Sequence, residues 1–149
     1  MILFHSETGF QLSNKLRHKR WLAAVAAHEN FKIGDVNYIF CDDDYLLKIN
    51  LEYLNHDTLT DIITFDYVEG KVLNGDIFIS IERVRENSEL FSVSFEQELL
   101  RVLSHGLLHL CGYKDKTDEE AAVMRGKEDF AIQLFQTIHY FFHVKTDER

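Results

Sequence analysis

Residues 61–81 read DIITFDYVEGKVLNGDIFISI, and this stretch decides the fold class. Apolar side chains alternate along residues 61–68, with Ile63, Phe65 and Tyr67 on one face, which predicts a half-buried strand. Residues 76–81 are rich in β-favouring side chains and predict a second strand. The connection at residues 69–75 holds two glycines and an Asn-Gly pair, which favours an antiparallel pairing of the two strands.

Upstream of this pair, the sequence predicts a helix, a further strand and a short second helix. The first helix runs from about Ser13 to residues 30–34, where a glycine offers a stop. Residues 35–41 alternate and predict a strand with Val36, Tyr38 and Phe40 on one face. The acidic residues 42–44 then open a short helix, because negative charge is favourable at a helix N-terminus. Residues 2–5 predict a short edge strand.

Downstream of the pair, the chain is predicted to be helical. One helix covers residues 81–90, and a longer one begins at Ser94 with a capping box and ends at Gly112. Thr117 and Glu120 form a second capping box, which opens a final helix to about residue 142. The whole pattern predicts an α+β fold, a small mixed sheet packed with several helices, with a metal-binding helix in a cleft.

Length and composition predict one domain, residues 1–149, because 46% hydrophobic residues in 149 suffice for a continuous core. Cys41 and Cys111 are the two cysteines, and their spacing indicates neither a disulfide framework nor a zinc ribbon. A reducing, intracellular setting follows. The start of the chain lacks the features of a signal peptide, and no run of about eighteen apolar residues occurs. We therefore expect a soluble, cytoplasmic protein with no membrane partner.

The formal charge of −9 argues against a protein that coats nucleic acid through bulk electrostatics. Any contact with RNA should then be local. One basic stretch stands out against the acidic background, namely Lys15, Arg17, His18, Lys19 and Arg20 before Trp21. The alternative interpretation is a solvated helix face, which is what charged runs usually form.

His105 and His109 are four residues apart in a predicted helix, so their rings project from one face about a turn apart. This spacing is typical of metal-binding helices, and a catalytic zinc ion takes three protein ligands and a water. The loop after Gly112 brings Asp115 back toward the two rings. The sequence therefore predicts one divalent ion, zinc by preference, held by His105, His109 and Asp115.

Two alternatives to this metal site stay open. The two histidines can be ordinary helix residues that are hydrogen-bonded to their neighbours, although Gly106 between them, unfavourable inside a helix, indicates a close approach to the backbone. His139 and His143 form a rival pair, with only Asp147 in the tail as a third ligand.

The string from His105 to Tyr113, His-Gly-Leu-Leu-His-Leu-Cys-Gly-Tyr, resembles the pattern of the YbeY family of metal-dependent ribosomal RNA maturation endoribonucleases. Residues 60–65 and residues 75–80 resemble two strands of the family, so the likeness covers roughly residues 35 to 130. The resemblance implies a single-strand-specific endoribonuclease in ribosomal RNA processing, including 3′-end maturation of the small-subunit RNA and ribosome quality control. It also implies one zinc ion, with nickel or another divalent ion as an alternative, and the ribosome and its small subunit as partners.

The chain departs from the family pattern at three places. The family has Asp-His after Gly-Tyr, whereas this chain has Lys114-Asp115, so the third imidazole is replaced by a carboxylate. Leu54 stands where the family has an arginine thought to act at the active site, and Leu59 replaces a proline. The general base is left unassigned.

A metal-bound water whose pKa falls from 15.7 toward about 7 suits hydrolysis of a phosphodiester, although attack by a ribose hydroxyl is equally open. Gly106 follows His105, so the carboxylate base of His-Glu-x-x-His proteases is missing and a metalloprotease is disfavoured. Glu98 and Arg101 are candidates to orient His105 and to neutralise phosphate, or are plain surface residues. The main competing function is a ribosome-assembly binding factor with a structural metal.

Overall fold

Four strands form one mixed sheet in the computed structural model, which describes residues 1–54 and 60–147, with side chains up to residue 138. The strands are β1 (Ile2–Ser6), β2 (Lys32–Cys41), β3 (Ile62–Asp66) and β4 (Val72–Ser80), in the order β1-β2-β4-β3. β1 and β4 run parallel to β2, and β3 runs antiparallel to β4. The predicted α+β class and the edge strand near the N-terminus are confirmed.

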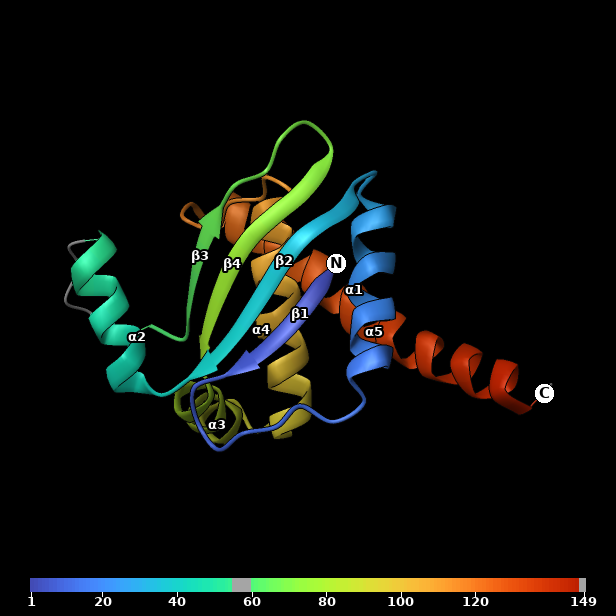
Figure 1. Cartoon of the computed structure of the whole chain (residues 1–149), viewed down its shortest axis with the longest axis horizontal. Helices are drawn as coiled ribbons and strands as arrows, with labels where there is room; N and C mark the ends of the chain where they lie inside the picture. The colour runs from blue at the N-terminus through green and yellow to red at the C-terminus, as the bar shows by residue number, and fades with distance from the viewer. Residues whose placement is uncertain (55–59, 148–149) are drawn as a thin grey trace.

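The helices are α1 (Lys15–His28), α2 (Asp43–Ile49), α3 (Ile81–Leu90), α4 (Phe95–Leu110) and α5 (Asp118–Asp147), and a π-helical turn, η1 (Asn50–Leu54), continues α2. Figure 1 shows α4 and α5 behind the sheet and α2 beside β3. None of the described helices combines the length and the apolar character needed to cross a bilayer. The sheet thus lies between a layer of helices that contains α1, α4 and α5 and a smaller layer formed by α2 and η1.

The main core lies between the sheet and helices α1, α4 and α5. As the alternation predicts, Val36, Tyr38 and Phe40 of β2 are buried on one face, and the Tyr38 hydroxyl donates to the Leu103 carbonyl of α4 at 2.8 Å. Gly106 lets α4 approach the sheet, because a Cβ there would lie only 2.9 Å from Ile77 Cγ2. This close approach fixes the height of α4 above β4.

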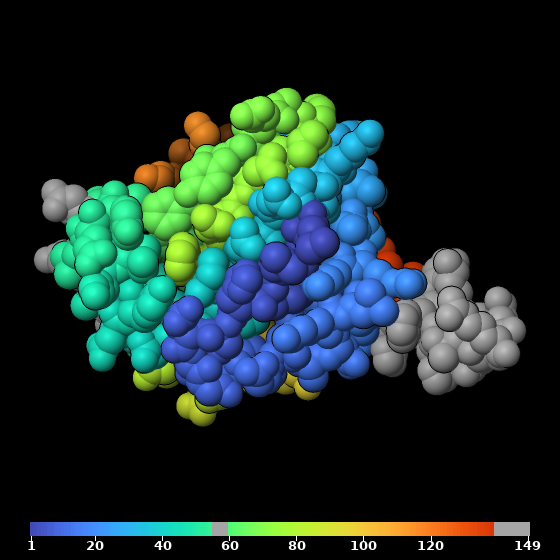
Figure 2. All heavy atoms as spheres, viewed as in Figure 1, coloured from blue at the N-terminus to red at the C-terminus, as the bar shows by residue number. Residues whose placement is uncertain are grey.

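The opposite face of the sheet is covered by α2 and η1. A second apolar cluster fills the interface, and its members are Cys41, Leu46 and Ile63 with Tyr45, Ile49, Phe65 and Phe78 packed against them. Figure 2 shows α2 and η1 as a ridge along the edge of the molecule next to β3. The acidic opening of this helix behaves as predicted, since the Asp42 side chain accepts from the Tyr45 amide at 2.8 Å.

Both predicted N-terminal caps are present, and the one at Thr117 is a complete capping box. The Ser94 hydroxyl accepts from the Gln97 amide at 3.1 Å and begins α4. The Thr117 hydroxyl accepts from the Glu120 amide at 3.1 Å, and Glu120 returns the bond to the Thr117 amide at 3.0 Å. These caps set the two ends of the segment that carries the candidate metal ligands.

Two predicted boundaries are wrong. The Asn74-Gly75 pair is not the turn: it lies inside β4, where Asn74 Oδ1 accepts from the Asp35 amide at 2.7 Å, and the chain turns near Gly70 instead. Ser13 does not cap α1, because the residue before the helix is Asn14, in the left-handed region at φ 54°. At Asn74-Gly75, pairing with a distant strand overrides the local turn preference.

Candidate metal centre

The two histidines lie on the last two turns of α4, facing a cavity. Their side chains are 20% and 27% exposed, and the His105 and His109 Nε2 atoms are 2.9 Å apart. The helix ends just beyond them because Gly112 adopts φ 101°, a conformation that side chains with a Cβ rarely take. The chain therefore reverses immediately after the second ring.

Asp115 returns to the two rings as expected. Its Oδ2 atom lies 3.0 Å from His105 Nε2 and 3.3 Å from His109 Nε2. Within the described part of the chain, these three residues are the one group of three or more metal-ligating side chains whose ligand atoms lie within 4.8 Å of one another. The structure thus brings together all three residues that the sequence singled out.

The other ring nitrogen of each histidine has a partner. His109 Nδ1 lies 2.8 Å from the Tyr113 carbonyl oxygen, which can only accept, so Nδ1 carries the proton and Nε2 is bare. His105 Nδ1 lies 2.5 Å from Glu128 Oε2, a carboxylate that likewise accepts. Burial alone would lower the pKa of His105, but the hydrogen bond and charge of Glu128 outweigh it and raise the pKa.

These residues fit a divalent metal ion. Two imidazole Nε2 atoms and a carboxylate oxygen lie within 2.9–3.3 Å of one another, and with both Nε2 atoms bare, as a bound cation requires, all three turn lone pairs toward one point. At metal–ligand distances of about 2.0–2.1 Å, tetrahedral ligands lie about 3.3 Å apart, so only small shifts are needed. Imidazole and carboxylate donors suit zinc and several neighbouring divalent ions.

Glu128 of α5 was missed by the sequence interpretation. It is 4% exposed, and its other oxygen accepts from Arg101 Nη1 at 2.9 Å. Arg101 also pairs with Asp129 at 2.8 Å, so its guanidinium joins α4 to α5 and is not available to phosphate as proposed. An acidic residue on the inward face of a helix is the one signal that would have pointed to Glu128.

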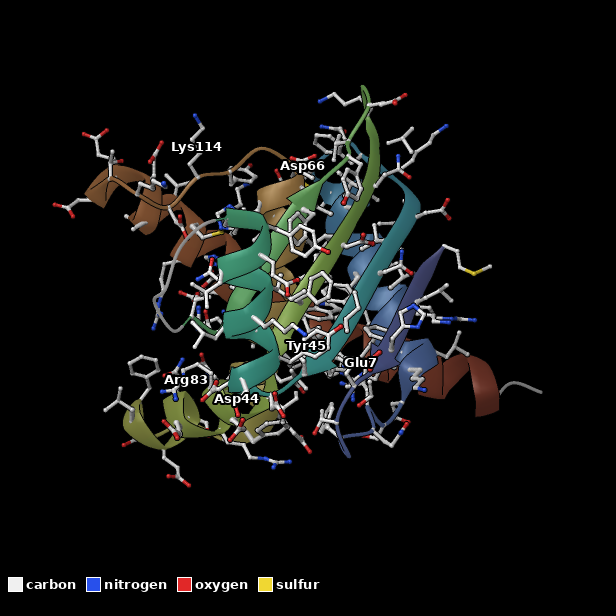
Figure 3. All side chains as sticks on the ribbon, turned by 60° about the vertical axis from the view of Figure 1, so that its left-hand side comes forward. Glu7, Asp44, Tyr45, Asp66, Arg83 and Lys114 are labelled. Atoms are coloured by element: carbon white, nitrogen blue, oxygen red, sulfur yellow. The ribbon has the colours of Figure 1, made fainter. Side chains whose placement is uncertain are left out.

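The three ligand candidates lie in the wall of a cavity of about 1040 Å³. α4, the α4–α5 loop and the start of β3 line it, and three exposed cations, Lys114, Lys116 and Arg125, are among its lining residues. Figure 3 shows Lys114 at the same end of the molecule as Asp66 of β3. Leu54, which replaces the family's arginine, also lines the cavity.

The loop that carries Asp115 is tied to α1 and α5. The Tyr113 hydroxyl donates to Glu29 at 2.5 Å, and Lys127 Nζ contacts the same carboxylate at 3.0 Å. Burial acts against the charged form of Glu29, but these two hydrogen bonds outweigh it and lower the pKa of that carboxyl. Glu29 and Lys127, which lie outside the loop in sequence, therefore hold the loop in place.

Other predicted candidates are placed differently. In the basic stretch of α1, His18 is buried, and the Arg17 guanidinium lies 3.6 Å from the centre of the Phe135 ring, so the stretch is partly structural. Leu59 lies outside the described residues, and so do the side chains of the rival pair His139 and His143.

Comparison with known proteins gives one consistent family. The family model described as Endoribonuclease YbeY matches residues 5–136. A Flavobacterium johnsoniae protein named Endoribonuclease YbeY is 59% identical over 91% of this chain and 97% of its own length. A protein of the same name from Karelsulcia muelleri is 50% identical over 91% of this chain and 94% of its own. A Thermotoga maritima protein solved in solution has a TM-score of 0.66, with 28% identity over all of this chain and 96% of that protein.

Proposed function

Because the chain belongs to the YbeY family of endoribonucleases, we propose that it cleaves single-stranded RNA with one divalent ion, zinc by preference, held by His105, His109 and Asp115. The observation that carries this proposal is the convergence of the two bare Nε2 atoms and one carboxylate oxygen in the wall of an open cavity. Three protein ligands leave a coordination position for water, the arrangement of catalytic rather than structural sites.

The chain's own residues prepare the site. Glu128 and the Tyr113 carbonyl orient the two rings and keep their Nδ1 atoms protonated. A bound divalent ion would polarise a phosphate oxygen and lower the pKa of a water in the open position. The exposed cations Lys114, Lys116 and Arg125 would hold neighbouring phosphates, the local contact that a chain of charge −9 needs.

We infer the biological substrate from the family. Ribosomal RNA is the expected substrate, in 3′-end maturation of the small-subunit RNA and in ribosome quality control, with the ribosome as partner. Residues 1–149 would act as one domain in the cytoplasm. The match to relatives over almost their whole length supports a single family domain.

The test combines metal analysis with cleavage. His109→Ala should lose the bound metal, measured by elemental analysis, and should lose cleavage of single-stranded RNA by at least about 100-fold. His5→Ala removes an exposed histidine of β1 and should change neither. A metal-loaded wild-type chain that leaves single-stranded RNA intact would contradict the nuclease proposal.

A ribosome-assembly factor with a structural metal is the second candidate. Leu54, 41% exposed in the cavity lining, is the observation that favours it, because an apolar side chain replaces the arginine of the family there. This candidate predicts a chain that binds ribosomal subunits and metal but does not cut RNA. Activity gained on Leu54→Arg would instead assign that position to catalysis.

A further inference from the structure

The cavity contains a buried carboxylate that the proposed reaction does not use. Glu98, on the first turns of α4, is 5% exposed and lines the cavity. Within the described residues, no hydrogen bond or ion pair to its carboxylate is found. A buried carboxylate normally accepts hydrogen bonds from nearby donors. The carboxylate of Glu98 can therefore accept hydrogen bonds from a ligand bound in the cavity.

The cations near Glu98, Arg101 and Arg125, attract its carboxylate through their charges, but among the described residues neither makes a hydrogen bond or ion pair with it. Arg101 is near in the sequence, but both ends of its guanidinium are bound to Glu128 and Asp129. Burial raises the pKa of Glu98, and the negative charge of Asp61, which lines the same cavity, raises it further; the attraction of Arg101 and Arg125 only partly offsets these effects. Donors from a ligand would stabilise the charged form.

Glu98 is too far from the metal-ligand candidates to exchange a proton there. It precedes His105 by seven residues on one helix, a rise of about 10.5 Å. Proton transfer needs hydrogen-bond contact, directly or through one water. Nor does Glu98 belong to a second metal site, because the described residues hold a single group of three ligating side chains, and it excludes Glu98.

An aromatic ring lies in the same cavity lining. Phe91, just after α3, is 54% exposed and lines this cavity. Exposed aromatic rings beside a nucleic-acid path serve as stacking platforms for bases. A carboxylate and an open ring together suit a nucleobase.

Guanine is the base that matches a charged carboxylate. Its Watson–Crick edge presents two adjacent N–H donors, and a carboxylate offers two acceptor oxygens. Adenine, cytosine and uracil each present an acceptor on that edge, which would face one carboxylate oxygen unfavourably. We propose that Glu98 and Phe91 form a subsite for a guanine base of the RNA, about 10 Å from the metal-ligand candidates along α4; this rests on the proposed function.

The test measures binding of short single-stranded RNAs that differ at one position, guanine against adenine, by fluorescence anisotropy with a chelator present to prevent cleavage. The wild-type chain should bind the guanine oligonucleotide about tenfold more tightly. Glu98→Gln exchanges one acceptor for a donor at nearly constant shape, so the preference should fall to about twofold or less. The matched control is Glu96→Gln, an exposed acid on the same helix, which should keep the preference.

Phe91→Ala is a second test of the subsite, which applies even if Glu98→Gln folds poorly. Loss of the exposed ring should weaken binding of both oligonucleotides about threefold to tenfold while the guanine preference remains. Equal affinities in the wild type, a preference that survives Glu98→Gln, or a second metal equivalent lost in that variant would each overturn the subsite. Cleavage is scored separately with metal restored: a guanine preference without cleavage would overturn the proposed reaction and support the subsite.

Discussion

The bare Nε2 atoms of His105 and His109 depend on what their Nδ1 atoms contact. A backbone carbonyl serves His109 and a buried carboxylate, Glu128, serves His105. Glu128 is 4% exposed, and Arg101 forms an ion pair with its other oxygen. One residue therefore controls both the orientation of a ligand candidate and the charge beside it.

Glu128→Gln should weaken metal binding about tenfold to 100-fold, because an amide can present its donor to Nδ1 and no longer fixes the ring. Competition with a chromophoric chelator measures the dissociation constant. Asp129→Asn, which alters the exposed partner of Arg101, is the control and should change the metal dissociation constant little. An unchanged affinity in Glu128→Gln would mean that Glu128 does not orient His105.

At the level of elements, α4 has two tasks, to pack on the sheet and to present the histidines. The packing is tight at Gly106, which lies against Ile77 of β4 and Ile62 of β3. The sequence suggested a close approach there but did not identify the sheet as the partner. Because the close contact lies next to His105, helix position and ring position are set together.

Gly106→Ala should destabilise the fold by about 1–3 kcal/mol, because overpacking against Ile77 and Ile62 exceeds the gain in helix propensity. The matched control is Gly126→Ala on α5, where a Cβ meets nothing within 4 Å and should stabilise by about 0.5–1 kcal/mol. Thermal unfolding of both variants measures the difference. Equal effects at the two positions would rule out a tight fit at Gly106.

The contact of α1 with the α4–α5 loop should depend on pH. The pKa of Glu29 is lowered in the folded chain, so its contribution is present above the ordinary carboxyl pKa of 4.5 and is lost as pH falls through the folded value. Glu29→Gln should therefore reduce stability by about 1–2 kcal/mol near pH 7, and the difference should shrink below about pH 4. Urea unfolding at several pH values measures the loss of unfolding free energy in Glu29→Gln. Glu89→Gln, at an exposed position, is the control. A loss in Glu29→Gln that does not depend on pH would contradict the expectation.

At the scale of the whole molecule, an acidic chain carries a cavity with basic residues at its rim. The net charge is −9, yet Lys114, Lys116 and Arg125 line the cavity that holds the ligand candidates. The basic stretch at the start of α1 is partly used in packing, with Arg17 on Phe135. RNA should therefore be held at the cavity rather than along α1.

Lys114→Ala and Arg125→Ala should each weaken RNA binding and reduce the slope of log K against log salt by about 0.7, the value for one phosphate contact on a single strand. Lys15→Ala on α1 is the control and should leave the slope unchanged. A larger effect at Lys15 than at the cavity rim would move the RNA path to α1.

The sequence predicted what local patterns determine and missed what distant contacts determine. The His105–His109 spacing, the turn at Gly112 and the helix caps at Ser94 and Thr117 are all local features, and each of them was found. Glu128 approaches His105 from another helix, and no spacing rule links residues 23 positions apart. The Asn74-Gly75 pair has a strong local turn preference, which the pairing of β4 with β2 and β3 overrides.

All three ligand candidates come from the eleven residues 105–115, and Asp115 stands on a loop outside the apolar core. A single codon change can therefore exchange the third donor between imidazole and carboxylate without repacking any helix. The net charge of the metal site, and with it the preference among competing metal ions, can therefore change during evolution with little change in the fold.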